Sequence, residues 1–157
     1  MELYDYIIII RILFCALVLS YLNALEKEHC HCTLDYRHKI LKNVSYIIIV
    51  LNVIDMTPYG AKLDEKYERS FREEEKYSPY TIFKGLLISI YAIILYTYVR
   101  DMNNTKCSCA LHDERYTHKF LSAIQNFLLI IGIIIFCVTC IHIYLYTISK
   151  KMVFKWK

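Results

Sequence analysis

Two short cysteine motifs carry the residues of this sequence that are best suited to chemistry. Each is a Cys-x-Cys pair, one formed by Cys30 and Cys32 and the other by Cys107 and Cys109. One thiol from each pair could form a disulfide between distant parts of the chain, and removing such a cross-link typically costs a small domain about 2–5 kcal/mol. The same four cysteines, as thiolates, could instead bind a tetrahedral Zn²⁺ ion. They are therefore disulfide candidates, with a zinc site as the alternative.

The neighbouring residues and the spacing bear on this choice. His29, His31 and His112 stand close to the pairs and could replace a cysteine as a zinc ligand. Structural zinc sites usually separate paired ligands by two to four residues, whereas a single residue separates these cysteines. The spacing therefore favours disulfides, and it predicts no metal and no other cofactor. Reduced thiols near lipid headgroups are the third alternative.

Long apolar segments flank both motifs. With 57% hydrophobic residues and a length of 157, the chain is too apolar for an ordinary soluble domain of this size. About 20 helical residues cross the roughly 30 Å core of a bilayer. Three of the four apolar blocks reach that length. The second block spans only if its helix begins near His38, and if Lys42 and Asn43 reach either a membrane interface or a partner helix. The four blocks are 6–25, 40–54, 80–99 and 120–148.

The two motifs belong to an internal repeat. The segment "CHCTLDYRHKILKNVSY" begins at Cys30, and "CSCALHDERYTHKFLSA" begins at Cys107, which gives an offset of 77 (107 minus 30). With a three-residue insertion, the His-Lys dipeptide at 38–39 aligns with the one at 118–119. Each motif follows one apolar block and precedes the next. We predict an all-α membrane protein with four transmembrane helices arranged as two pseudo-repeated hairpins.

This topology has a consequence for the cysteines. When a chain crosses a membrane four times, the loops after its first and third spans emerge on the same face. Both Cys-x-Cys pairs are therefore expected on one face, where their four thiols can meet.

The hairpins also define the domain organisation. The segment between them opens with turn residues and carries Glu-Arg pairs four residues apart, a spacing that supports a short helix on the surface. We therefore expect three units: 1–56 as the first hairpin, 57–79 as a charged surface helix or linker, and 80–157 as the second hairpin with a basic, aromatic tail.

Several classes of function lack the residues that they need. The net charge of +4 comes without a basic cluster of the kind that binds nucleic acid, so we expect no nucleic-acid partner. The sequence contains no phosphate-binding loop, nucleophile elbow or metalloprotease motif. No apolar block has an Asp or Glu at its middle, as proton and ion pathways normally do. We therefore expect a protein that is not an enzyme.

The first motif resembles a known class of viral membrane proteins. Its Cys-x-Cys is followed by a small residue, an acidic residue, an aromatic and two basic residues, and it lies between apolar helices in a duplicated frame. This arrangement resembles small multi-pass membrane proteins of nucleocytoplasmic large DNA viruses, the giant viruses. The second motif departs from this pattern after Ala110. The matching residues are Cys30, Cys32, Thr33, Asp35, Tyr36, Arg37 and His38.

The resemblance implies a structural role in the virion. It implies a non-enzymatic component of the internal lipid membrane that anchors this membrane to the capsid shell, as a minor capsid protein does. Its partners would be the lipid bilayer and neighbouring membrane or capsid proteins. Two alternatives are an accessory transmembrane subunit of a cellular complex, such as a respiratory assembly, and a small redox or metal-handling membrane enzyme that uses the four cysteines.

Overall fold

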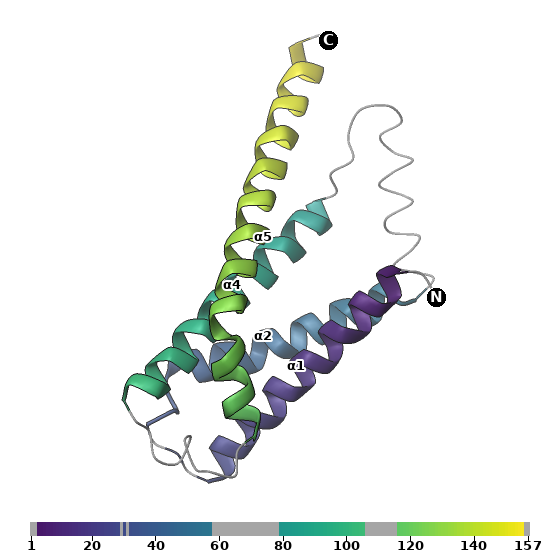
Figure 1. The fold of residues 1–157 in the computed structure, drawn as a ribbon. Helices are drawn as coiled ribbons and strands as arrows, with labels where there is room; N and C mark the ends of the chain where they lie inside the picture. Colours follow the sequence, from purple (N-terminus) through teal and green to yellow (C-terminus); the bar gives the residue numbers. More distant parts are fainter. Residues whose placement is uncertain (1–2, 29, 31, 58–78, 106–115, 156–157) are drawn as a thin grey trace.

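The structure is a computed structural model that describes residues 3–28, 30, 32–57, 79–105 and 116–155. All regular secondary structure within these ranges is α-helical, which confirms the all-α prediction (Figure 1). The helices are α1 (Leu3–Lys27), α2 (Tyr36–Asp55), α4 (Pro79–Asn104) and α5 (Tyr116–Lys155).

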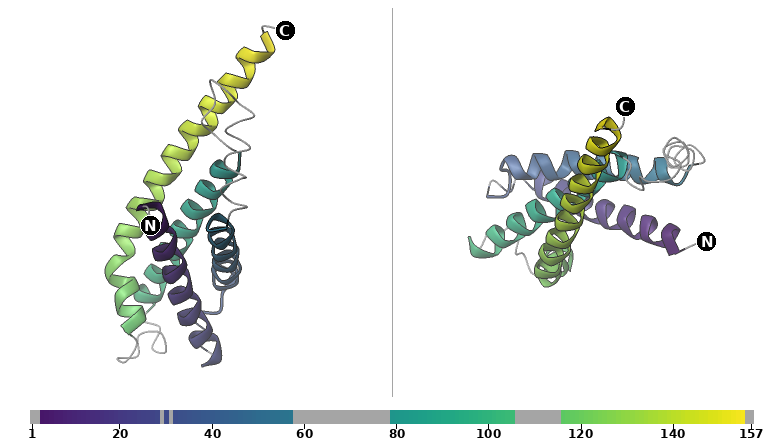
Figure 2. Two further views of the ribbon diagram at one scale, coloured as in Figure 1. Left: turned by 90° about the vertical axis from the view of Figure 1, so that its right-hand side faces the viewer. Right: turned by 90° about the horizontal axis from the view of Figure 1, so that it is seen from above.

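The helices form two antiparallel hairpins, α1 with α2 and α4 with α5. α1 and α4 end at the same end of the molecule, where α2 and α5 begin (Figure 1). We call this the cysteine end, because Cys30 and Cys32 lie there. α4 packs against both α2 and α5, whereas α1 packs mainly against α2. At the opposite end α5 continues beyond the other helices (Figure 2).

Three of the described helices are long and apolar enough to cross a membrane, over Tyr6–Lys27, Pro79–Asn104 and Tyr116–Ile148. This number fits a multi-pass membrane protein. The fourth predicted span is not shown by this measure, because α2 falls short of it. Three basic residues lie near the start of α2, and several polar side chains interrupt its apolar sequence. Both features lower its mean hydropathy.

The packing of the first hairpin follows a seven-residue pattern. Buried positions are spaced alternately by three and four residues along α2, as in a coiled coil, which keeps one face of the helix toward its neighbours. Three of these buried residues, His38, Ser45 and Asn52, are polar. The buried residues of α2 are His38, Leu41, Ser45, Ile48 and Asn52, and those of α1 include Ile8, Cys15, Val18, Leu22 and Leu25.

Small residues let the helices of the second hairpin approach closely. A Cβ atom added at Gly85 of α4 would lie 2.5 Å from Oγ1 of Thr139 on α5, which is too close for two atoms not bonded to each other. A Cβ atom at Gly132 of α5 would lie 3.1 Å from Cβ of Ala92 on α4. Close backbone approach at small residues is typical of helices that pack in lipid.

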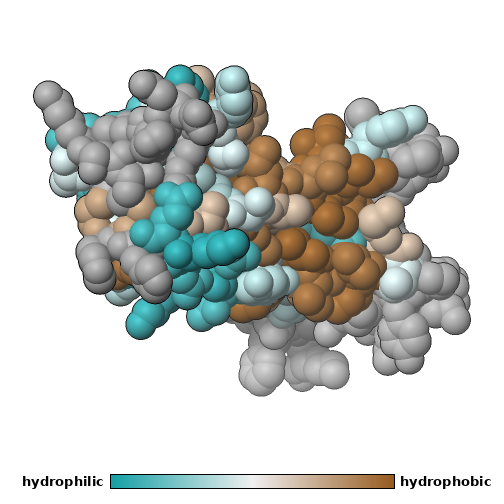
Figure 3. All heavy atoms as spheres, turned by 90° about the horizontal axis from the view of Figure 1, so that it is seen from below, coloured by the Kyte–Doolittle hydropathy of each residue, from teal (hydrophilic) through white to brown (hydrophobic). Residues whose placement is uncertain are grey.

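The outer surface of the bundle is largely apolar. Seen from the cysteine end, a hydrophilic patch lies beside a broad hydrophobic face (Figure 3). A soluble monomer rarely exposes an apolar area of this kind, whereas hydrocarbon tails would cover it. Large exposed apolar side chains of α5 include Phe127, Ile130, Ile133, Ile134 and Phe136.

Candidate functional site

The first Cys-x-Cys motif forms the turn between α1 and α2. Cys30 and Cys32 are both disulfide-bonded, and Cys30 is buried. Cys107 and Cys109 lie outside the described residues, as do His29, His31 and His112. The predicted pairing between the two motifs therefore stays a prediction. The zinc alternative also stays untested, and it would require the four cysteines in their reduced form.

Hydrogen bonds fix this turn against the ends of both helices. The amide of Cys30 donates to the carbonyl oxygen of Leu25, at 3.2 Å, and the amide of Thr33 donates to the carbonyl oxygen of Cys30, at 2.9 Å. Asp35 caps α2, because its carboxylate accepts from the amide of His38 at 3.0 Å. The Asp35 cap thus sets the start of α2, directly after the turn that carries the cysteines.

Two tyrosine–histidine pairs join the two hairpins directly above this turn. The hydroxyl of Tyr98, on α4, lies 3.0 Å from Nδ1 of His38, on α2. The hydroxyl of Tyr21, on α1, lies 2.7 Å from Nδ1 of His118, on α5. All four side chains are buried. Each pair therefore connects one helix of the first hairpin to one helix of the second.

The internal repeat relates these two pairs to each other. Tyr98 follows Tyr21 at the same offset as the cysteine motifs follow each other (98 minus 21 is 77). His118 follows His38 at that offset plus the three-residue insertion (118 minus 38 is 80). The same contact is thus made twice in opposite directions, as at a two-fold interface between identical subunits.

The sequence repeat aligns the two histidines, whereas the two tyrosines were not predicted as site residues. A signal was present, because Tyr21 precedes Cys30 by nine residues and Tyr98 precedes Cys107 by nine. Other positions at the same offsets are also buried in both halves. These equivalent buried pairs are Leu22 with Val99, Leu25 with Met102, and Leu41 with Leu121.

The hydrogen bonds around His118 assign the position of its proton. Its Nε2 lies 3.0 Å from Oδ1 of Asn103, and Nδ2 of Asn103 donates to Oγ of Ser122 at 2.9 Å. An amide oxygen only accepts, so Nε2 of His118 carries the proton. Its Nδ1 then accepts from the hydroxyl of Tyr21. The sulfur of Met102, 3.6 Å from this hydroxyl, is the weaker acceptor.

His38 carries its proton on the other ring nitrogen. The hydroxyl of Tyr98 donates to the carbonyl oxygen of Thr33 at 3.1 Å, so it must accept from Nδ1 of His38. Nε2 is then left with a lone pair. The side chain is only 3% exposed, and Nε2 has no hydrogen-bond partner among the described residues. We call this atom the bare Nε2.

The repeat explains why the two histidines differ. At the offset of 77, Glu26 takes the place of Asn103, and at the offset of 80, Lys42 takes the place of Ser122. Lys42 donates to Glu26 at 2.5 Å. An ion pair thus replaces the neutral amide–hydroxyl pair of the second hairpin. The Glu26 carboxylate contacts Lys42, whereas the equivalent amide of Asn103 contacts His118.

The surroundings of His38 keep it neutral. Burial lowers the pKa of His38, and the charge of Lys42 acts in the same direction. The carboxylates of Glu26 and Asp35 act in the opposite direction, although burial is the largest effect. His38 lies in the first turn of α2, before the charge-free residues 43–54, and so outside the apolar part of that helix.

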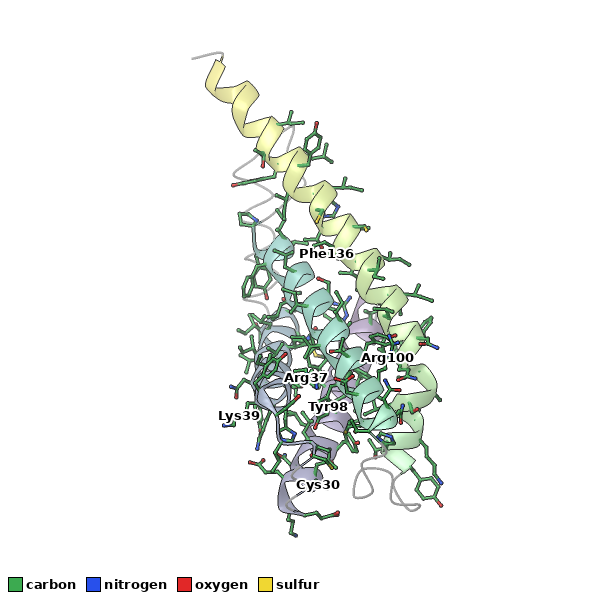
Figure 4. The ribbon with its side chains drawn as sticks, turned by 90° about the vertical axis from the view of Figure 1, so that its left-hand side faces the viewer. Cys30, Arg37, Lys39, Tyr98, Arg100 and Phe136 are labelled. Carbon is green, nitrogen blue, oxygen red and sulfur yellow. The ribbon has the colours of Figure 1, made fainter. Side chains whose placement is uncertain are left out.

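A second set of ion pairs lies beside the histidines. Arg37 donates to Asp35 at 2.6 Å and to Asp101 of α4 at 2.5 Å. Cys30, Arg37 and Tyr98 gather toward the cysteine end, whereas Phe136 lies farther along α5 (Figure 4). Exposed ion pairs of this kind contribute little to stability. The arginine therefore orients α2 against α4 more than it stabilises the bundle.

The opposite end of α2 is held by a more buried ion pair. Lys84 of α4 donates to Asp55, and the hydroxyl of Tyr80 donates to the same carboxylate at 2.8 Å. The Asp55 side chain is only 4% exposed. Both ends of α2 are thus tied to charged groups of neighbouring helices.

Comparisons with known proteins assign no family to this arrangement. The sequence matches no family model, and neither the curated proteins nor the solved structures give a match. The description of the site therefore depends on the contacts of the chain's own residues. These contacts are suited to fastening two hairpins together and, at the bare Nε2, to binding a proton.

Proposed function

We propose that this chain is a non-enzymatic structural membrane protein whose two helical hairpins are fastened to each other at the cysteine end. The observation that carries this proposal is the reciprocal pair of contacts, Tyr98 with His38 and Tyr21 with His118. Buried hydrogen bonds of this kind fix which helices pack together, because leaving their polar groups unpaired costs about 1–3 kcal/mol each. They therefore define one arrangement of the hairpins.

Disulfides between the two Cys-x-Cys motifs are part of this proposal. Cys30 and Cys32 are disulfide-bonded, and helices α1 and α4 both end at the cysteine end, so their following loops start there. We propose Cys107 and Cys109 as the partners. Such cross-links would join the hairpins covalently beside the two tyrosine–histidine pairs.

We also propose that α2 is a fourth membrane span. Besides the basic residues near its start, polar residues that face the other helices lower its hydropathy, namely His38, Ser45 and Asn52. Its exposed side chains over 44–54 are all apolar: Tyr46, Ile47, Val50 and Val53. A helix with polar residues inside and apolar residues outside is suited to lipid and would be poorly suited to water.

The length of its charge-free stretch supports the same conclusion. α2 carries no charge over 43–54, and the corresponding charge-free stretches are 12–25 in α1 and 85–99 in α4. The stretch in α2 is therefore only slightly shorter than those of two helices that are apolar enough to span. The ion pairs of Lys42 with Glu26 and of Asp55 with Lys84 partly neutralise the charges that bound it.

For the biological setting, we propose the internal membrane of a large DNA virus. This proposal is supported by the resemblance of the residues from Cys30 to His38. In that setting the protein would anchor the membrane to the capsid shell as a minor capsid protein. Lys39 and Arg100 are exposed at the cysteine end and could contact the shell.

The topology can be tested by labelling from the two sides of a membrane. In a background without Cys15, Cys137 and Cys140, we would introduce Lys39→Cys or Thr57→Cys, one beyond each end of the proposed span of α2. An impermeant maleimide should reach the two thiols from opposite sides. Labelling of both from the same side would contradict the four-span proposal.

The setting requires a separate measurement. If the virion proposal is right, quantitative mass spectrometry should find many copies in purified virus particles, released only by detergent. Co-purification with a cellular respiratory assembly, and absence from particles, would instead favour the role of accessory subunit.

A further inference from the structure

Position 26 is where the two halves of the site differ in a way that points to a further property. Asn103 stands at the equivalent position in the second hairpin and contacts Nε2 of His118. Glu26 instead contacts Lys42, and the bare Nε2 of His38 lacks the partner that its counterpart has. We infer that His38 is a proton-binding switch, in which a proton on the bare Nε2 draws the Glu26 carboxylate from Lys42 to His38.

The geometry needs only a small movement. His38 and Lys42 are four residues apart on α2, so their Cβ atoms lie about 5–6 Å from each other on one face of the helix. Glu26 already reaches Lys42 at 2.5 Å, and its side chain is half exposed, at 52%. A change of side-chain rotamer is therefore enough to move the carboxylate by one helical turn.

The other groups that face His38 cannot serve as the acceptor equally well. On α4, the Tyr98 hydroxyl is already committed to Nδ1 and to Thr33. In the turn before α2, the Asp35 carboxylate caps the amide of His38 and accepts from Arg37. Glu26, on α1, has Lys42 as its partner, and Lys42 can be solvated instead because it is partly exposed.

The exchange balances without any reactant except a proton from solvent. Nε2 gains a hydrogen, and the imidazolium donates from Nδ1 to Tyr98 and from Nε2 to Glu26. Lys42 loses its carboxylate partner and becomes a free cation at the cysteine end. Acidification thus replaces the contact of Glu26 with Lys42 by a more buried contact with His38. It leaves the positive charge of Lys42 unpaired at this surface.

His118 provides an internal reference in the same molecule. Its Nε2 donates to Asn103, and its Nδ1 accepts from Tyr21, so both nitrogens already have hydrogen-bond partners. A proton on Nδ1 would force the Tyr21 hydroxyl toward the weaker acceptor, Met102. We therefore expect His38 to titrate with Glu26 and His118 to be insensitive to this residue.

The test is ¹⁵N NMR of selectively labelled histidines in the full chain, solubilised in micelles. At neutral pH we expect opposite tautomers, with the proton of His38 on Nδ1 and that of His118 on Nε2. During acid titration, Glu26→Gln should lower the midpoint of His38 and leave that of His118 unchanged. Glu28→Gln, which removes a charge two residues away, is the matched control and should have a much smaller effect on His38.

Two results would overturn the inference. One is a proton on Nε2 of His38 at neutral pH, and the other is a His38 midpoint that Glu26→Gln does not change. If Glu26→Gln fails to fold, Lys42→Gln tests the same exchange by changing the other residue of the ion pair. Removing the competing cation should raise the midpoint of His38, and an unchanged or lowered midpoint would contradict the switch.

Discussion

In the second hairpin, Ser122 holds Asn103 and Asn103 holds His118, so every ring nitrogen of that histidine has a partner. In the first hairpin, the equivalent Lys42 and Glu26 hold each other, and the bare Nε2 of His38 is left over. The two tyrosine–histidine pairs have the same residues and the same backbone frame. The difference arises from the side chains beside each histidine, an amide and a hydroxyl in one hairpin against a carboxylate and an ammonium in the other, and from the Thr33 carbonyl oxygen that accepts from Tyr98.

This comparison separates two roles that one contact can have. A tyrosine–histidine pair whose nitrogens are all satisfied is a fastening, because any change leaves a buried group unpaired. The same pair with one open nitrogen still orients two helices, but it can also gain a proton. Each half of the repeat therefore contains the same tyrosine–histidine contact. The residues beside each histidine determine whether it has an unpaired nitrogen that can gain a proton.

The largest expected effect comes from removing the disulfides of Cys30 and Cys32, which we propose to join the two hairpins. Replacing Cys30 and Cys32 by Ser should lower the free energy of unfolding by about 2–5 kcal/mol, the typical effect of losing a native disulfide in a small domain. Thermal unfolding in detergent would measure this loss. Cys137→Ser with Cys140→Ser is the control, since both thiols are free and exposed. An unchanged melting profile of the Cys30 and Cys32 variant would contradict the fastening role.

The next largest effect distinguishes the Tyr21–His118 pair, whose histidine nitrogens both have partners, from the Tyr98–His38 pair, whose histidine has the bare Nε2. His118→Leu leaves the Asn103 oxygen without its histidine donor, at about 1–3 kcal/mol for an unsatisfied group, and leaves the Tyr21 hydroxyl with the weaker Met102 sulfur as acceptor. His38→Leu removes the bare Nε2 itself, and Tyr98 retains its bond to Thr33. We therefore expect the larger loss of stability for His118→Leu, measured by denaturant titration in micelles. Equal losses, or a larger loss for His38→Leu, would contradict the proton assignment.

Because each tyrosine–histidine pair joins the two hairpins, we expect its two residues to be energetically coupled. This coupling energy should be smaller than the two losses of stability described above. A double-mutant cycle of Tyr21→Phe with His118→Leu should give a coupling of about 0.5–3 kcal/mol, as for residues in one hydrogen-bond network. The cycle of Tyr21→Phe with His38→Leu pairs residues of the same hairpin, with no hydrogen bond between them in the described structure. That cycle should be additive to within about 0.5 kcal/mol. Stronger coupling within the hairpin than between hairpins would refute the exchanged pairing.

Much of this frame could be predicted from sequence. The Cys-x-Cys repeat predicted two hairpins that turn at the same end, and the His-Lys dipeptides located both histidines. The tyrosines were missed because the chain has 15 of them, and only the nine-residue spacing to the cysteines distinguishes Tyr21 and Tyr98 from the others. A repeat shows which positions are equivalent, but not that equivalent positions contact each other across the two halves.

The status of α2 and the position of each proton could not be predicted in the same way. Hydropathy averages over all sides of a helix, so the inward-facing polar residues Ser45 and Asn52 counted against a span although lipid would not contact them. The tautomer of His38 depends on a carbonyl oxygen, that of Thr33, whose position only the folded turn defines. Each of these features depends on which way a group faces.

The smallest expected effect is a pH dependence of stability to which His38 contributes. Because burial lowers the pKa of His38, the unfolded chain takes up this proton first, near the ordinary histidine value of about 6.5. Between that pH and the lower pKa of the folded state, the unfolded chain holds more protons. The free energy of unfolding must therefore fall as the pH decreases through this window, and it is highest above it. Unfolding in micelles over a pH series should show this slope in the wild type, and His38→Leu should reduce it by the contribution of one proton. His118→Leu should leave the His38 contribution in place, and a slope that His38→Leu does not reduce would contradict this expectation.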